Sequence, residues 1–180
     1  MRLAKVPVVR WVLCIGAVGI ASLLAVGAPI MPGATKLPGH VRSLAKIDRI
    51  RLVIDPIPRH LADAGITRSS IRERAVGLLK NYEIALDDKS EDIPELHLVL
   101  IEITETDVAD AIAYLLGLQL HQTVRIPRLN ESVRVPTYSH IGGGLEARSK
   151  VEDSVRSVVD TMVKIFGNNA RQATQAFERR

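Results

Sequence analysis

The sequence predicts an α+β fold, in which a largely antiparallel sheet of four to five strands carries two main helices on one face. The expected order is βαββββα, behind an N-terminal hydrophobic helix. Three observations predict it. Residues 94–105 and 112–126 are long aliphatic runs joined by a polar connection, which indicates an antiparallel hairpin. Residues 67–80 and 151–166 carry apolar side chains at helical spacing. Residues 11–31 contain no charged side chain.

The N-terminal segment has the pattern of an export signal. Arg2, Lys5 and Arg10 precede the uncharged run, as a basic region precedes the hydrophobic region of a signal peptide. The run is also close to the length that spans a bilayer as a helix. We therefore expect residues 1–30 to be a signal peptide or a membrane anchor, with membrane contact through residues 11–31 if the leader is not cleaved. Both alternatives stay open at this point.

Export places the rest of the chain in the periplasm or on the outer face of the inner membrane. Cys14 is the one cysteine of the chain, and it lies at the start of the apolar run, where a lipoprotein signal needs a cysteine at the end. Lipidation is therefore not expected, and the exported part can contain neither a disulfide nor a thiol nucleophile.

The remaining chain divides by composition. Prolines and glycines mark residues 31–46 as a linker, residues 47–167 have the apolar periodicity of an α/β envelope domain, and residues 168–180 form a polar tail. The first elements of the domain are expected to be a strand around Ile50, Leu52 and Ile54, a helix over 67–80 with a capping box of Ser70 and Glu73, a short strand over 82–86 and a polar loop over 87–94.

The two long strands have unequal faces, and a third strand over 133–140 extends them into a meander. Side chains alternate between the faces of a strand, so each face can be read from every second residue. The face expected to carry the helices holds Leu96, Leu98, Leu100, Tyr114, Leu116, Leu118 and Leu120. The other face is mixed and holds His97, Val99, Ile101, Ile103, Leu115, Gln119, His121 and Thr123.

The glycine run at 142–144 is expected to be a flexible connection to the last helix. It precedes a helix, as phosphate-binding loops do, but it lacks the spacing and the lysine of a P-loop. Ser149 and Glu152 offer a capping box for that helix, and residues 167–169, Gly-Asn-Asn, are expected to end it. The apolar stripe of the helix consists of Val151, Val155, Val158, Val159, Met162, Val163 and Phe166.

This order of elements, behind a leader and a linker, resembles small uncharacterised exported α/β proteins of the bacterial envelope. In architecture it is also similar to the lipopolysaccharide-assembly lipoprotein and to the amino-terminal domain of the translocation protein TolB. The likeness rests on packing patterns and brings no catalytic residue with it. The segments that carry it are Leu52 to Asp55, Gly65-Ile66-Thr67, Pro94 to Ile103, Leu118 to Arg128 with its Gln122-Thr123-Val124 centre, and Val151 to Phe166.

Three groups of residues are candidates for sites of chemistry. His97 and His121 approach each other if the hairpin closes near residue 109, but two imidazoles fall short of the usual three or four metal ligands. His140 beside Ser139 is no triad, because neighbouring strand residues point to opposite faces. We therefore predict no catalytic, metal or cofactor site. Possible anion contacts are Arg125, Arg128 and Arg134, which with Pro127 and Pro136 could equally protect a strand edge from pairing.

Composition excludes several functions. The formal net charge is +4, but three of those charges precede residue 28, and so little excess charge in the domain argues against a nucleic-acid partner. Aromatic residues make up 3% of the chain, which is too few for stacking platforms that bind single strands.

The sequence therefore predicts a non-catalytic exported domain that binds a protein or lipid component of the cell envelope through a sheet face or edge. The possible partner face comprises His97, Val99, Ile101, Leu115 and His121. Two alternatives stay open. One is an envelope hydrolase whose active site is not recognisable, and the other is a carrier of a lipid or other apolar small molecule, which requires a deep apolar pocket.

Overall fold

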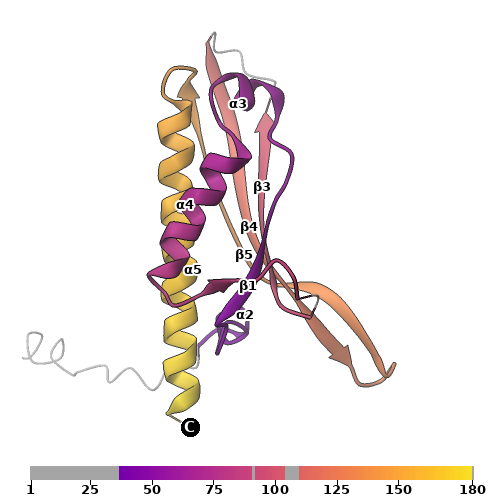
Figure 1. Ribbon diagram of the computed structural model, residues 1–180. Coiled ribbons are helices and arrows are strands. Elements are labelled where there is room, and N and C mark those ends of the chain that lie inside the picture. The colour runs from indigo at the N-terminus through magenta and orange to yellow at the C-terminus, as the bar shows by residue number, and fades with distance from the viewer. Residues whose placement is uncertain (1–36, 91, 104–109, 180) are drawn as a thin grey trace, which may run out of the picture. The chain divides into compact units, whose positions relative to one another are not determined.

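The computed structural model describes residues 37–90, 92–103 and 110–179 (Figure 1). They belong to one compact unit, Leu37–Arg180, and the predicted hydrophobic helix lies outside the described residues. The helices are α2 (Gly39–Arg42), α3 (Arg59–Asp63), α4 (Arg68–Lys80) and α5 (Val151–Glu178). The strands are β1 (Arg49–Ile54), β2 (Ala85–Leu86), β3 (Glu95–Ile103), β4 (Ala111–Ile126) and β5 (Glu131–Ala147). The α+β fold is confirmed, with the short helices α2 and α3 in addition to the predicted elements.

The five strands form one mixed sheet in the order β2-β1-β3-β4-β5. β3, β4 and β5 form the predicted antiparallel meander. β1 pairs parallel to both β2 and β3, because the chain returns to the sheet from β1 through α3 and α4, as in a strand-helix-strand unit. The antiparallel part is much the longer one, and β2 is shorter than expected because Glu83, with φ of 61°, still belongs to the turn after α4.

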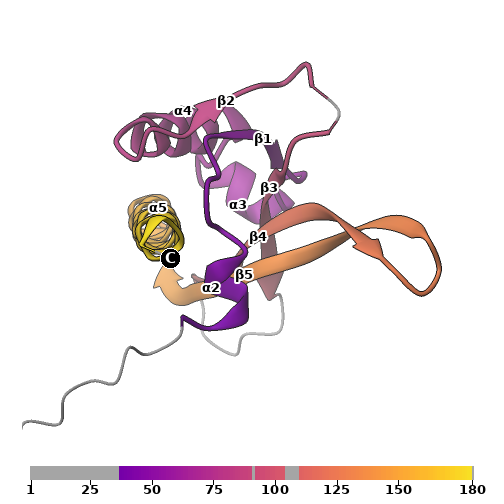
Figure 2. The same cartoon turned by 90° about the horizontal axis from the view of Figure 1, so that it is seen from below.

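Both main helices lie on the same side of the sheet (Figure 2). The sheet face beneath them is the one that the alternation predicted, and its seven predicted side chains are all buried. α5 buries its predicted stripe against this face, and Phe166 meets the ring of Tyr138 edge-on with 5.7 Å between ring centroids. Burial of one continuous face thus accounts for the sheet and both helices.

α5 does not end at Gly167, as the sequence predicted, but continues to Glu178. The prediction was wrong because Ala170 and Ala173 are buried, and their packing holds the helix together past the Gly-Asn-Asn signal. Gly167 is needed for a different reason. It faces the ring of Tyr82, and a Cβ at this position would lie 2.6 Å from Cδ1 of that ring.

Both predicted capping boxes were also wrong. α4 begins at Arg68, close to the predicted start, but its N-cap is Thr67 rather than Ser70, and the hydroxyl of Thr67 accepts a hydrogen bond of 3.1 Å from the backbone N–H of Ser70. Ser70 is therefore the N3 residue of the capping box, and not its N-cap as predicted. At α5 the N-cap is Lys150, and no side chain caps the helix there.

The glycine run at 142–144 belongs to β5 rather than to a flexible connection, so β5 is longer than predicted. These glycines allow a close approach of neighbouring elements. A Cβ on Gly142 would lie 3.0 Å from Cγ1 of Val158 in α5, and one on Gly143 would collide with the backbone of β4. Glycine is thus required at these positions because a side chain would prevent the close packing of β5 against α5 and β4.

Residues 37–46, expected to be linker, contain α2 and contribute Val41 and Leu44 to the core. The backbone N–H of Lys46 donates to Oγ1 of Thr174, 2.9 Å away, and so ties this segment to the last turns of α5. The leader expected at residues 1–30 stays a prediction.

Candidate functional site

The candidate site is the face of the sheet that points away from α4 and α5, which we call the outer face (Figure 2). Strand pairing arranges its side chains in rows. Arg51 pairs with Glu95 and Glu95 with His121, so these three side chains lie side by side across β1, β3 and β4. Three rows further along β3, Ile101 pairs with Leu115. The outer face is therefore charged at one end and apolar at the other.

The apolar half consists of large aliphatic side chains from three strands. Ile101 is 52% exposed and Leu115, its pairing partner, is 39% exposed. On β5, Ile141 is 67% exposed and Leu145 is 54% exposed. Water contacts all of these side chains at a cost in free energy that a docked surface would remove. We define the apolar half as Val99, Ile101, Ile103, Leu115, Ile141 and Leu145.

Sequence reasoning found Val99, Ile101 and Leu115 of this half but missed its contribution from β5. The signal was present, because Ile141, Gly143 and Leu145 keep the period-two alternation of a strand. The prediction of a flexible connection at the glycines concealed this alternation.

The charged half, comprising Arg51, Glu95, His97, His121 and Arg134, is organised around the carboxylate of Glu95. Its Oε1 accepts from Arg51 at 3.0 Å and from Arg134 at 2.5 Å, and its Oε2 lies 3.2 Å from Nε2 of His97. Burial by itself raises the pKa of Glu95, but the hydrogen bonds from His97 and Arg134 outweigh it, and the net shift of the pKa is downward. Glu95 is thus held as a carboxylate by its neighbours.

The structure brings the two predicted histidines together. The rings of His97 and His121 have centroids 4.4 Å apart, and Nε2 of His121 lies 3.2 Å from Oε1 of Gln119. Burial lowers the pKa of His121, and the charges of His97 and Arg134 lower it further. Among the residues that the structure describes, no three His, Cys, Asp or Glu side chains are placed to hold a metal ion.

The three predicted arginines do not converge on one point. Arg134 engages Glu95, whereas Arg125 donates to Oδ1 of Asn130 at 2.5 Å. Arg128 lies exposed in the turn that follows β4. This hairpin of β4 and β5 projects beyond β3, as Figure 1 shows, because β3 begins at Glu95, opposite His121. A shared anion contact stays a prediction.

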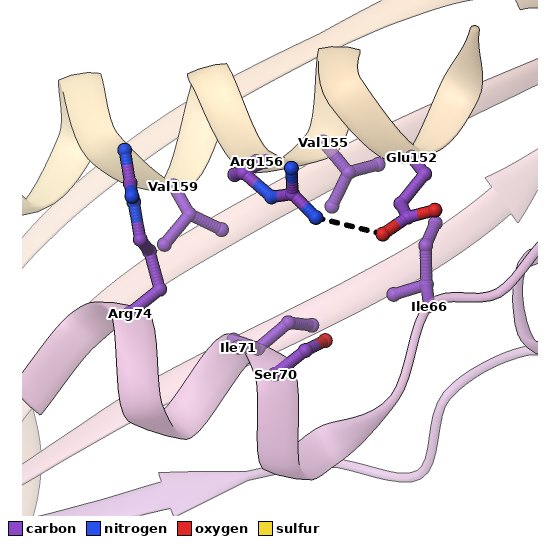
Figure 3. Close-up of a pocket in the computed structure, with 8 residues that line it drawn as sticks. All are labelled: Ile66, Ser70, Ile71, Arg74, Glu152, Val155, Arg156 and Val159. Carbon is purple, nitrogen blue, oxygen red and sulfur yellow. Dashed lines mark hydrogen bonds and ion pairs between the residues drawn. The ribbon is translucent and has the colours of Figure 1, made fainter.

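A small cavity lies between α4 and α5 (Figure 3). Its volume is about 20 Å³, which is room for one water molecule and far too little for a lipid. Polar side chains close it on one side, where Nη2 of Arg156 donates to Oε1 of Glu152 at 2.7 Å. The carrier alternative requires a deep apolar cavity between sheet and helices, and this one does not meet that requirement.

A more open depression of about 400 Å³ lies where α2 meets β5. It is lined by His40, Gln119, Pro136, Thr137, Tyr138 and Ser139, and it has no cluster of acidic and basic side chains of the kind that a hydrolase needs.

No family model matches the sequence, and no curated protein resembles it. Among solved structures, the chain is similar to a minor lipoprotein from Acinetobacter baumannii, with 10% identity and a TM-score of 0.40 over 73% of this chain and 94% of that one. It is also similar to the rare lipoprotein B from Shewanella oneidensis, with 14% identity and a TM-score of 0.25 over the same shares.

Both of these structures are bacterial lipoproteins. A TM-score below 0.5 leaves a shared fold unestablished, so neither likeness assigns a function to this chain. The likeness to the TolB domain stays a prediction.

In the described part of the chain, no helix combines the length and the apolar character that crossing a bilayer requires. The anchor predicted at residues 11–31 lies outside the described residues.

Proposed function

We propose that this chain is a non-catalytic binding domain of the bacterial cell envelope, exported through its N-terminal leader, and that it binds a protein partner on the apolar half of the outer face. The observation that carries the proposal is the exposure of Ile101, Leu115, Ile141 and Leu145 on one uncovered sheet face. Exposed aliphatic side chains that are contiguous across three strands mark interaction surfaces in soluble domains.

The chemistry of the outer face favours a protein partner over a lipid surface. A domain that docks on an anionic membrane combines apolar side chains with cations that reach the head groups. Here the two arginines of the charged half, Arg51 and Arg134, are bonded to Glu95. A row of aliphatic side chains beside an ion-paired polar cluster is instead the composition of a protein interface with an apolar core and a polar rim.

Site-specific photo-crosslinking in the native host tests the proposal. A photoreactive residue is placed at Ile101 in the full-length chain, and Leu129 serves as the matched control, because it is equally exposed, at 54% against 52%, but lies in the projecting hairpin. We expect one discrete protein adduct at Ile101 and none at Leu129. Adding Leu115→Asp, which places a charge beside Ile101, should abolish the adduct while the circular dichroism spectrum stays unchanged.

Three outcomes would contradict the proposal. They are equal adducts at both positions, an adduct at Ile101 that survives Leu115→Asp, and an adduct with lipid alone. Cell fractionation with intact-mass measurement tests export independently, since a full-length product in the cytoplasm would overturn the assignment to the envelope.

A further inference from the structure

We propose that two copies of this chain associate through the free edge of β5. The two β5 strands pair antiparallel about a two-fold axis at Gly143, so that the sheet of one copy continues into the sheet of the other. This association uses a strand edge and does not depend on the partner proposed for the apolar half.

The free edge follows from the alternation of the backbone in β5, the last strand of the sheet. The N–H of Arg148 donates to the C=O of Asp110 at 2.9 Å, on the side of β4. Successive residues of a strand point their N–H and C=O groups to opposite sides. The backbone groups of Ser139, Ile141, Gly143 and Leu145 therefore point away from β4.

Nothing in the described part of the chain bonds to these outward groups. Among the described residues, the edge is contacted only near Thr137, where Oγ of Ser43 donates to the C=O of Thr137 at 3.3 Å and Pro136 lacks a donor. From 137 to 147 β5 contains neither proline nor lysine, the residues that commonly protect strand edges. The outward backbone groups from Ser139 to Leu145 are thus available to pair with another strand.

The sequence of β5 complements itself about Gly143. In that register Ile141 lies opposite Leu145 of the second copy on the outer face, and His140 lies opposite Glu146 of the second copy on the other face. Each of these pairs occurs twice, because the axis is two-fold. An aliphatic pair and a pair of basic and acidic side chains are both favourable cross-strand neighbours.

Neighbouring registers lack this complementarity. An axis at Gly144 sets His140 opposite Arg148, and an axis at Gly142 leaves Ile141 opposite a glycine. The Gly143 register alone brings together the two most exposed aliphatic side chains of β5, at 67% and 54% exposure. It also adds about six backbone hydrogen bonds between the copies, two for each of three outward pairs.

Disulfide trapping tests the register. In full-length chains that carry Cys14→Ser, which removes the native thiol, His140→Cys and Glu146→Cys are prepared separately. Residues opposite each other in such a non-hydrogen-bonded pair have Cα atoms about 4.5 Å apart, within the roughly 4.4–6.8 Å that a disulfide spans. Two copies of His140 would lie six residues out of register, or roughly 20 Å apart. We expect a covalent dimer from the mixture and none from either variant alone.

Sedimentation velocity of the full-length chain gives a second measurement. Leu145→Pro removes an outward N–H without touching a bond to β4, so it should weaken dimerisation at least tenfold, whereas Leu145→Val should not. His140→Glu should weaken it through repulsion by Glu146, and adding Glu146→Lys should restore it. Circular dichroism checks that each variant is folded. A monomeric native chain, a dimer insensitive to Leu145→Pro, or equal trapping by single variants and mixture would overturn the proposal.

Discussion

A methyl group added at Gly167 would meet the ring of Tyr82, which makes this glycine a sensitive test of the packing between α5 and the turn after α4. The added Cβ would lie 2.6 Å from Cδ1 of Tyr82 and nearer still to Cγ and Cδ2. Carbon atoms in contact are normally about 3.5–4.0 Å apart, so the ring has to move by about an ångström. That movement also disturbs Arg171, whose guanidinium lies 5.1 Å from the ring centroid.

Two opposing effects set the magnitude. Alanine is more favourable than glycine inside a helix by about 1 kcal/mol, and inserting a methyl group into a filled site costs about 1–3 kcal/mol. We therefore expect Gly167→Ala to lower the free energy of unfolding by up to about 2 kcal/mol. Gly77 in α4 is the matched control, because an added Cβ there meets nothing within 4 Å. Gly77→Ala should stabilise the protein by about 1 kcal/mol.

Urea unfolding followed by circular dichroism measures these differences, and a double-mutant cycle assigns the cause. In a Tyr82→Ala background the obstructing ring is absent, so Gly167→Ala should stabilise the protein, as it does at Gly77. The sign of the Gly167→Ala effect thus reverses with the residue at 82. A stabilising effect in the native background, or the same effect in both backgrounds, would refute the reasoning.

Two further predictions concern charge. The pKa of His121 is lowered by burial, so the unfolded state takes up a proton more readily as the pH falls below about 6.5, and stability should decrease toward pH 5. Urea unfolding at pH 7 and pH 5 should show a smaller loss for His121→Gln than for His140→Gln, and equal losses would contradict it. Arg74 donates to both carboxylate oxygens of Asp160 and so joins α4 to α5. Arg74→Met should lower the urea midpoint measurably, whereas Arg59→Met, at an exposed pair 3.9 Å apart, should leave it almost unchanged.

The elements that could be predicted from sequence are those in which buried side chains recur at the spacing of a strand or a helix. Leu96, Leu98 and Leu100 alternate with partly exposed residues, and all three are buried beneath the helices. The stripe of α5 repeats at helical spacing for the same reason. When one face of an element is buried along its whole length, apolar residues recur in the sequence at the period of that element. The meander and both main helices could therefore be predicted.

The features that could not be predicted depend on a neighbour distant in the chain. Glycine serves either a flexible connection or a close approach, and the two uses look alike in sequence. Only the ring of Tyr82 explains Gly167, and only Val158 and the backbone of β4 explain the glycines of β5. The same holds for the charged half, where Glu95 gathers Arg51 and Arg134 from separate strands.

These glycines also relate the packing of β5 to its two proposed surfaces. Gly142 and Gly144 lie on the side of α5, with Val158 and Ser154 as their neighbours, so the helix can cover this strand closely. The residues between and beside them, Ile141 and Leu145, then point to the outer face, and their backbone groups point to the free edge. Substitutions at even-numbered positions such as Gly142→Ala should therefore change stability, because Val158 must give way. At the odd-numbered position 145, Leu145→Pro should change association while stability stays nearly constant. Gly143 is the exception among the odd positions, because a Cβ there would collide with the backbone of β4. If the same residues carried both roles, one substitution would change stability and association together, whereas the alternation of side chains in β5 separates the two roles at Gly142 and Leu145.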